Sequence, residues 1–209
     1  MSILSIFVLL CCIAVHDSSD TCSGDSCKKF QLNKDNFNKR LRGHGLYEMI
    51  VPGHHDCVRN CLYLSVCKSI DFYRKDKTCK LNDVNSTQVT NSDFEQQNGA
   101  IFSDITVWPC AMAGKCGSRP CSKRQRCIQG EDTHRCADIS CGRPPYVQNG
   151  KATLVTPGGY MYGDNATVTC DTGYSPAQTT VQCNILEKWD NTVCVKNQKD
   201  EDDSKTIDV

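Results

Sequence analysis

Cysteine is the residue that most constrains this chain. The sequence holds 17 cysteines in 209 residues, a density typical of folds held together by disulfide bonds in an oxidising compartment. Aromatic residues make up only 7% of the chain, so a large apolar core is not expected. The sequence therefore predicts small disulfide-rich modules rather than one large catalytic scaffold.

The charge balance limits the kinds of partner. Lysine and arginine number 24, aspartate and glutamate also number 24, and the formal net charge is zero. A general nucleic-acid binder would show a strong positive balance. We therefore expect no nucleic-acid partner, and any charged contact must be local.

An apolar run from Ile3 to Ile13 begins the chain. It is shorter than the roughly 20 residues that cross a bilayer and has the length of a signal-peptide core. Small residues ahead of Ala14 predict a signal peptide at residues 1–14, and no other stretch suits a membrane span. We therefore expect a secreted, extracellular protein.

Signal cleavage would change the cysteine count. Loss of Cys11 and Cys12 leaves an odd number of cysteines, so one is unpaired or forms a disulfide-linked dimer with a second chain. Two Asn-x-Ser/Thr sequons, at Asn85 and Asn165, are acceptor sites for N-linked glycans in a secreted protein. We expect a glycoprotein modified at these two asparagines.

Residues 141–194 show the clearest organisation. Four cysteines are separated by turn signals and short alternating runs, in which Ala166, Val168 and Cys170 share one face of a strand. This pattern predicts a small all-β module. The cysteine spacing alone permits three disulfide connectivities.

The same segment resembles the sushi, or complement control protein, module. The resemblance rests on Cys141-Gly142, Pro144-Pro145, Asn149-Gly150, Tyr162-Gly163-Asp164, Thr169-Cys170, Gly173-Tyr174, Cys183, Trp189 and Cys194. It implies two disulfides, Cys141–Cys183 and Cys170–Cys194. The sequence departs from the family at Ser175-Pro176-Ala177, where leucine and glycine are usual, and in having no proline before Cys194.

The segment from Cys22 to Cys110 combines one helix with several strands. Cys57 and Cys61 lie four residues apart, the spacing of one helical face, and predict a short helix at about His55 to Tyr63. Strand-forming residues flank a turn at residues 75–77, which predicts a hairpin. The expected strands cover residues 46–51, 69–73, 78–81 and 100–108.

This Cys-x3-Cys helix, followed by a cysteine, an aromatic strand and another cysteine, resembles the PAN/apple domain. The resemblance implies an α+β domain over residues 22–110, with one short helix and an antiparallel sheet. It implies the disulfides Cys57–Cys79 and Cys61–Cys67. A bridge between the domain ends would join Cys110 to either Cys22 or Cys27; the alternative is a local Cys22–Cys27 bridge with the odd thiol elsewhere.

Residues 111–137 are similar to the first two thirds of an epidermal-growth-factor (EGF) module. The resemblance implies a truncated EGF-like linker with the disulfides Cys116–Cys127 and Cys121–Cys136. The final cysteine pair of that family is missing, and so is the acidic entry that binds calcium, since residues 111–115 read Ala-Met-Ala-Gly-Lys. We therefore expect no EGF-type calcium site.

Residues 195–209 contain an acidic run from Asp200 to Asp203 and few apolar side chains. Such a composition predicts a disordered acidic tail. The tail either keeps the chain soluble or contacts calcium or mineral, and the sequence does not choose between these roles.

The sequence shows no catalytic constellation. None of the five histidines lies in a known catalytic motif. His54 and His55 are adjacent and so point to different faces of a helix start, which predicts a solvated helix entry rather than a metal site. Cys-x2-Cys pairs, which would suggest zinc, do not occur. We therefore expect no enzymatic activity, no metal and no cofactor.

Two basic segments, residues 28–44 and 115–135, are the strongest functional lead. Clustered arginine and lysine can bind the sulfates and carboxylates of an acidic glycosaminoglycan, although such runs are more often solvated faces. The candidate glycan-binding residues are Lys28, Lys29, Lys39, Arg40, Arg42, Arg119, Lys123, Arg124 and Arg126.

Together these features predict a secreted, non-enzymatic binding or adhesion protein of the extracellular matrix or cell surface. Loops of its modules would contact proteins or glycans. One alternative is a structural component of a secreted matrix, mineralised or not. Another is a non-catalytic regulator that docks on a protease or a growth factor.

Overall fold

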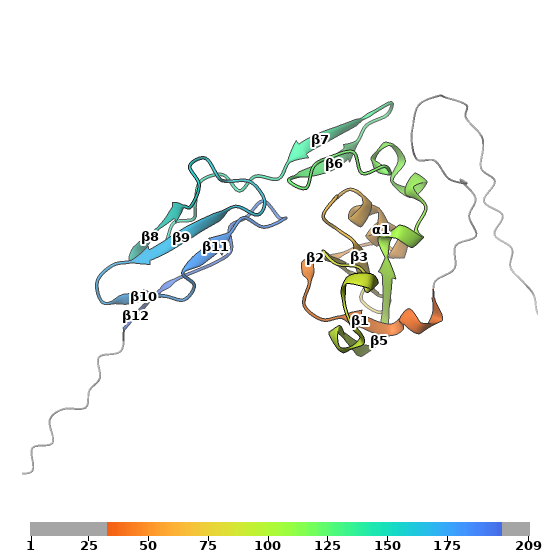
Figure 1. Cartoon of the computed structure of the whole chain (residues 1–209), viewed down its shortest axis with the longest axis horizontal. Coiled ribbons are helices and arrows are strands. Elements are labelled where there is room, and N and C mark those ends of the chain that lie inside the picture. Colours follow the sequence, from red (N-terminus) through yellow and green to blue (C-terminus); the bar gives the residue numbers. More distant parts are fainter. Residues whose placement is uncertain (1–32, 198–209) are drawn as a thin grey trace, which may run out of the picture. The chain divides into compact units, whose positions relative to one another are not determined.

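The computed structural model describes residues 33–197 (Figure 1). The chain divides into two compact units between Ala137 and Asp138, and each is described by itself. No helix in residues 33–197 is long and apolar enough to cross a membrane. The expected signal peptide, Cys22, Cys27, Lys28, Lys29 and residues 198–209 of the acidic tail lie outside the described residues.

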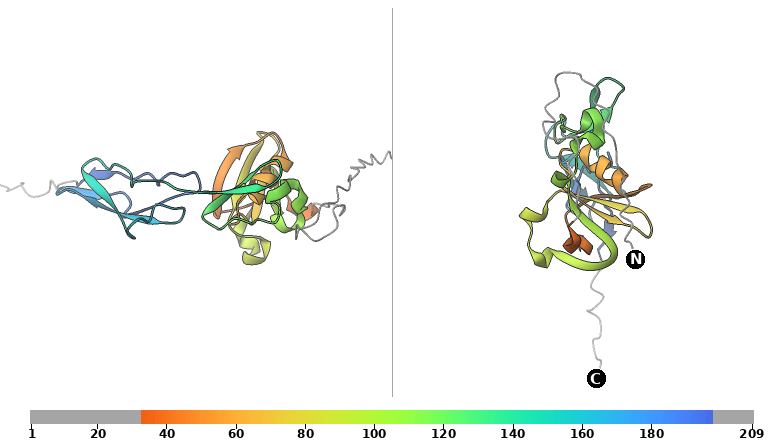
Figure 2. Two further views of the ribbon diagram at one scale, coloured as in Figure 1. Left: turned by 90° about the horizontal axis from the view of Figure 1, so that it is seen from above. Right: turned by 90° about the vertical axis from the view of Figure 1, so that its right-hand side faces the viewer.

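The first unit is an α+β domain, as the sequence predicts. Its five-stranded antiparallel sheet has the order β1-β5-β3-β4-β2, and one α-helix, α1 (His54–Leu62), lies on it (Figure 2). The strands are β1 (Phe37–Leu41), β2 (Gly45–Ile50), β3 (Ser69–Tyr73), β4 (Thr78–Asn82) and β5 (Phe94–Asp104). Short 3-10 helices are η1 (Lys34–Asn36), η2 (Ser86–Gln88), η3 (Asn91–Asp93), η4 (Ile105–Val107) and η5 (Cys110–Cys116).

Helix α1 forms because its apolar residues fall on one face. Cys57, Val58, Cys61 and Leu62 are all buried. Cys57 is bonded to Cys79 of β4, and Cys61 to Cys67 just after the helix. These are the pairs that the PAN/apple resemblance implies, and they fix the helix on the sheet. The predicted helix and hairpin are confirmed to within one residue at each end.

Strand β5 differs from the expected strand at 100–108. It begins at Phe94 and ends at Asp104, because residues 105–107 turn into the 3-10 helix η4. The Ile105 amide still donates to the Lys68 carbonyl opposite it, at 2.9 Å. The residues at the start of β5 are mostly polar, so their sequence shows no strand alternation. Their pairing with β1 is what makes them a strand.

The first half of β5 folds across the sheet. It pairs with β1, as in Leu41 opposite Phe94, whereas the second half pairs with β3. The bend lies at Gly99, whose φ is +82° and whose amide donates to Asn38 Oδ1 at 2.9 Å. The Phe94 ring then meets Phe102 edge to face at 4.9 Å. By strand alternation Phe102 faces away from α1, so β1 and the first half of β5 form a second layer there.

Buried polar side chains fasten this second layer. Asp71 Oδ1 accepts from the Leu41 amide at 3.1 Å, and Asp71 Oδ2 accepts from Asn82 Nδ2 at 3.1 Å. Lys80 Nζ donates to the carbonyls of Leu41 at 2.8 Å and Gly43 at 3.0 Å, and lies 3.9 Å from Asp71 Oδ2. Asp71 and Asn82 are fully buried. The backbone that crosses the sheet is therefore satisfied by side chains of β3 and β4.

Residues 111–137, expected as a linker, pack on the first unit. They contain η5 and a hairpin of β6 (Gln125–Gln129) and β7 (His134–Asp138), with the disulfides Cys116–Cys127 and Cys121–Cys136. The Cys127 amide donates to the Tyr63 carbonyl at 2.9 Å, and Arg59 Nε donates to the Met112 carbonyl at 3.2 Å. The segment is thus part of the same compact unit as α1.

The second unit is all β, as predicted. Its strands are β8 (Gly150–Leu154), β9 (Asn165–Cys170), β10 (Tyr174–Pro176), β11 (Thr180–Gln182) and β12 (Cys194–Lys196). They form one sheet in the order β11-β9-β8 and a separate β10-β12 pair. The disulfides Cys141–Cys183 and Cys170–Cys194 are the pairs that the sushi resemblance implies.

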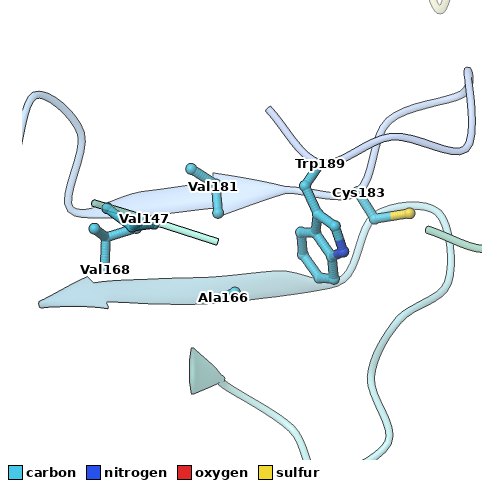
Figure 3. Close-up of a cluster of buried hydrophobic side chains, with 6 residues drawn as sticks. All are labelled: Val147, Ala166, Val168, Val181, Cys183 and Trp189. Atoms are coloured by element: carbon cyan, nitrogen blue, oxygen red, sulfur yellow. The ribbon is translucent and has the colours of Figure 1, made fainter. Parts of the chain in front are cut away.

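The core of the second unit is small (Figure 3). Ala166 and Val168 of β9 face Val181 of β11, and Trp189 lies at one end of this cluster. Trp189 Nε1 donates to the Gly142 carbonyl at 3.3 Å. The expected tail begins too early, because Val195 and Lys196 pair with β10.

Candidate functional site

The basic residues on β1 and just after it are largely engaged within the protein. Lys39 Nζ lies 4.0 Å from the centroid of the Phe94 ring. Arg40 donates to Glu95 and, at 3.4 Å, to the Tyr73 hydroxyl, and these two hydrogen bonds raise the pKa of Arg40. Arg42 donates to the Ser92 carbonyl. Because Glu95 balances the Arg40 charge, this strand is less cationic than its sequence indicates.

The candidate residues of the second basic segment, 115–135, lie in different environments, some of them half-buried and others exposed. Arg119 donates through Nη2 to the carbonyls of Leu64 and Cys67, and burial lowers the pKa of its guanidinium. Arg119 therefore joins residues 111–137 to the end of α1 and is not available to a glycan, which corrects the expectation. Lys123 and Arg124 are exposed before β6. Arg126 is half-buried and bridges to Leu64.

His54 is packed against aromatic rings, so the expected solvated helix entry is wrong for this residue. Its ring stacks on Phe72 at 5.2 Å and meets Trp108 edge to face at 4.9 Å. Burial, helped by the nearby His55, lowers the pKa of His54 to about 4. His54 Nε2 has no hydrogen-bond partner among residues 33–197. His55 is exposed, as expected.

We predict that His54 makes the first unit less stable in acid. The pKa of His54 falls from 6.5 to about 4 on folding, so the unfolded chain binds the proton first as the pH drops. The contribution of His54 is complete above pH 6.5 and is lost as the pH falls toward 4. Denaturant unfolding at pH 7.5 and pH 5.0 should show a smaller acid loss for His54→Phe than for the wild type.

His55→Phe is the control for this experiment, because it removes the lesser cause of the lowered His54 pKa, the nearby His55, and leaves the larger cause, the burial of His54. It should keep most of the wild-type pH dependence. Equal acid losses in the wild type and His54→Phe would contradict the prediction.

The two sequons lie in different local structures. Asn85 caps η2, with Oδ1 accepting from the Thr87 amide at 3.2 Å and the Thr87 hydroxyl at 2.8 Å. Asn165 is the first residue of β9, and its Oδ1 accepts from Gln182 Nε2 at 3.3 Å. Both asparagines are half-buried. Glycosylation at these residues stays a prediction.

Exposed apolar side chains gather in the second unit. Of the large hydrophobic residues exposed within 33–197, these belong to it: Tyr146, Val155, Tyr160, Leu186, Val193 and Val195. Sequence reasoning missed them, because an apolar residue in a short strand reads as a core residue. The alternation of Val193 and Val195 around Cys194 was the sequence signal that could have predicted two outward-facing valines.

Val193, just before β12, and Val195 within it flank Cys194 and face the same way. Cys194 between them is bonded to Cys170 and packs on the core, so both valines turn outward; they are 59% and 54% exposed. Across the strand pair, Val195 is opposite Ser175, and the Ala177 amide donates to the Val193 carbonyl at 2.9 Å. The result is a small apolar surface, which we call the β12 face.

Tyr146 is an exposed aromatic side chain on a rigid segment. It is 89% exposed, although the next residue, Val147, is buried in the core. Pro144 and Pro145 precede it and restrict the backbone. The backbone that carries this exposed ring thus has little conformational freedom to lose on binding.

A metal ion requires several ligand side chains placed together. Residues 33–197 hold no group of three or more histidine, cysteine, aspartate or glutamate side chains placed to bind one. The surfaces that remain for a function are the β12 face, Tyr146 and the exposed cations Lys123 and Arg124.

Comparison with known families agrees with this division of the chain. The PAN domain family matches residues 27–107, and the Sushi repeat (SCR repeat) family matches residues 141–194. Neither match covers residues 111–137, so the EGF-like assignment stays a prediction. No curated protein matches the chain.

Proposed function

We propose that this protein is a secreted, non-enzymatic adhesion protein whose sushi repeat docks on an extracellular protein. PAN and sushi modules are typical of extracellular binding proteins, and this chain has one of each. The observation that carries the proposal is the β12 face, where Val193 and Val195 are exposed side by side on a strand held by a disulfide.

Energetics favour a protein partner for this face. Full burial of a valine side chain stabilises a complex by about 1.5–3 kcal/mol, and roughly half of each side chain remains to be buried here. A second contribution would come from Tyr146, because tyrosine on a rigid segment is a common energetic centre of protein interfaces. A glycosaminoglycan gains little from apolar contacts of this kind.

The disulfide supports docking by limiting motion. Cys170–Cys194 ties β12 to β9, and β12 also pairs with β10. Side chains on a fixed strand lose less conformational entropy on binding than those on a mobile loop. The β12 face is therefore preorganised for binding.

Acidic-glycan binding is the second candidate function. Lys123 and Arg124 are adjacent and exposed just before β6. If this function operates, the protein is retained on immobilised heparin above physiological salt, and Lys123→Ser with Arg124→Ser abolishes retention. Elution below physiological salt contradicts it.

The docking proposal is tested with a photo-crosslinking residue placed at Val195 in the full-length protein. Cross-linking in extracellular fluid should capture a defined protein, and Val193→Ser should reduce the affinity of the purified pair by about three- to tenfold. The control places the crosslinker at Ile50, an apolar residue of the PAN domain that is 81% exposed, against 54% for Val195.

The outcomes separate the proposed functions. Capture of the same proteins from Val195 and Ile50, or an unchanged affinity in Val193→Ser, contradicts docking through the β12 face. A disulfide-linked ladder on non-reducing gels would instead favour the structural-matrix alternative. A captured protease or growth factor would favour the regulator.

A further inference from the structure

The outer face of the β11-β9-β8 sheet is almost entirely polar. Ala166 and Val168 of β9 point into the core, so the alternate residues of β9 point to solvent. The outward residues of the three strands are Asn165, Thr167 and Thr169, with Lys151 and Thr153, and with Thr180 and Gln182. Val155, just after β8, is the apolar exception on this face and is 60% exposed.

Val155 is the direct cross-strand neighbour of Asn165. Leu154 pairs with Ala166, and one step further the Val155 amide donates to the Asn165 carbonyl at 3.0 Å. Residues opposite each other on antiparallel strands place their Cβ atoms about 5 Å apart on the same face. The valine methyl groups therefore lie beside the Asn165 carboxamide.

The carboxamide of Asn165 is oriented by the strand on its other side. Gln182 of β11 is opposite Asn165, and its Nε2 donates to Asn165 Oδ1 at 3.3 Å. With Oδ1 engaged by β11, Nδ2 lies on the side of the carboxamide away from this hydrogen bond, while Val155 flanks Asn165 on the β8 side. Neither this nitrogen nor the Thr167 hydroxyl two residues on is engaged by another described residue, and Thr167 is exposed.

We infer that Asn165 carries an N-linked glycan whose first N-acetylglucosamine lies over Val155. In the modification, Nδ2 forms a bond to C1 of the sugar of a lipid-diphosphate-linked oligosaccharide. The C1–O bond breaks with its electron pair on the departing lipid diphosphate, and Nδ2 loses one proton to a base. The C–H groups and the acetamido methyl of the sugar then cover the valine and remove it from water.

This inference is independent of partner docking. The glycan occupies the outer face of the β11-β9-β8 sheet, whereas Val193 and Val195 belong to the separate β10-β12 pair. Glycan loss should expose Val155 without altering the β12 face. Exposed apolar side chains of this unit thus divide into one that a sugar covers and others that remain for a partner.

The test uses the full chain, secreted from cells that add oligomannose glycans, behind a signal peptide already known to direct secretion. A failure of the chain's own signal then does not affect the result. Mass spectrometry should find the glycan on the peptide that contains Asn165 in the wild type and in Thr167→Ser. It should be absent from Thr167→Ala and Asn165→Gln. Unmodified Asn165 in the wild type would overturn the inference.

Methyl NMR with labelled valine tests the contact. An endoglycosidase that leaves one N-acetylglucosamine should leave the Val155 methyl resonances unchanged, with a nuclear Overhauser effect to the acetamido methyl. Both Thr167→Ala and Asn165→Gln should shift the Val155 resonances alike, while those of Val195, the control, stay in place. Val155 resonances that are the same with and without the glycan would overturn the predicted contact.

Discussion

Replacing Trp189 with alanine is expected to lower the free energy of unfolding of the sushi repeat by about 3–5 kcal/mol. Trp189 is only 8% exposed and closes a core of five other small or medium side chains (Figure 3). A module of this size has no other large side chain in that cluster to compensate. The two disulfides would hold the unfolded chain compact but would not restore the lost packing.

Hydrogen exchange of the full-length protein measures this effect, because it reports the two units separately. Trp189→Ala should abolish slow exchange in β9 and β11 and leave β3 and β4 unchanged. Leu186→Ala, at an exposed residue close by in the sequence, is the control and should have little effect. A loss below about 1 kcal/mol in Trp189→Ala would show that the disulfides, not the apolar cluster, carry the stability of the module.

Replacing Asp71 with alanine is expected to destabilise the PAN unit by about 3 kcal/mol. The change leaves the Leu41 amide and Asn82 Nδ2 without an acceptor in a buried site, and separates Lys80 from its nearest carboxylate. Each buried donor left unsatisfied costs about 1–3 kcal/mol, and breaking a buried ion pair is similarly costly. The second layer formed by β1 should loosen first.

Asp71→Asn is the matched variant, because it keeps the shape and one acceptor. It should cost less than Asp71→Ala at pH 7.5, although the ion pair with Lys80 is lost in both variants. Asn82 Oδ1, which is buried without a hydrogen-bond partner among residues 33–197, can turn to accept from the new amide. Denaturant unfolding and exchange of the β1 amides measure both variants. Equal losses in the alanine and asparagine variants would show that hydrogen bonding at Asp71 is not what fastens β1.

Asp71 also has a pH effect opposite to that of His54. Burial raises the pKa of Asp71 from 3.8 to about 6, although its hydrogen bonds and Lys80 act against the shift. Its contribution to stability is complete below pH 3.8 and is lost as the pH rises through 6. Between pH 4 and 6 the two groups therefore offset each other, and only the single variants reveal either one.

Local patterns in the amino-acid sequence were sufficient for the framework of both modules. The four-residue spacing of Cys57 and Cys61 defines a helical face, and the alternation of Ala166 and Val168 defines a strand face; both depend only on backbone periodicity. The families suggested by the cysteine patterns are matched at residues 27–107 and 141–194. Four disulfides within residues 33–197 join the cysteines that the PAN and sushi resemblances imply. The other two join the cysteines that the EGF resemblance implies, in a segment that neither family match covers.

Features that depend on contacts between distant residues could not be read in this way. The polar start of β5 becomes a strand only because β1 pairs with it, and Arg119 becomes a buried donor only because residues 111–137 fold onto α1. His54 lies at a helix start that looked solvated, yet Phe72 and Trp108 enclose it. Val193 and Val195 are the converse case, since more than half of each residue stays exposed within residues 33–197. Periodicity follows from the geometry of one segment, whereas burial depends on which other segments arrive beside it.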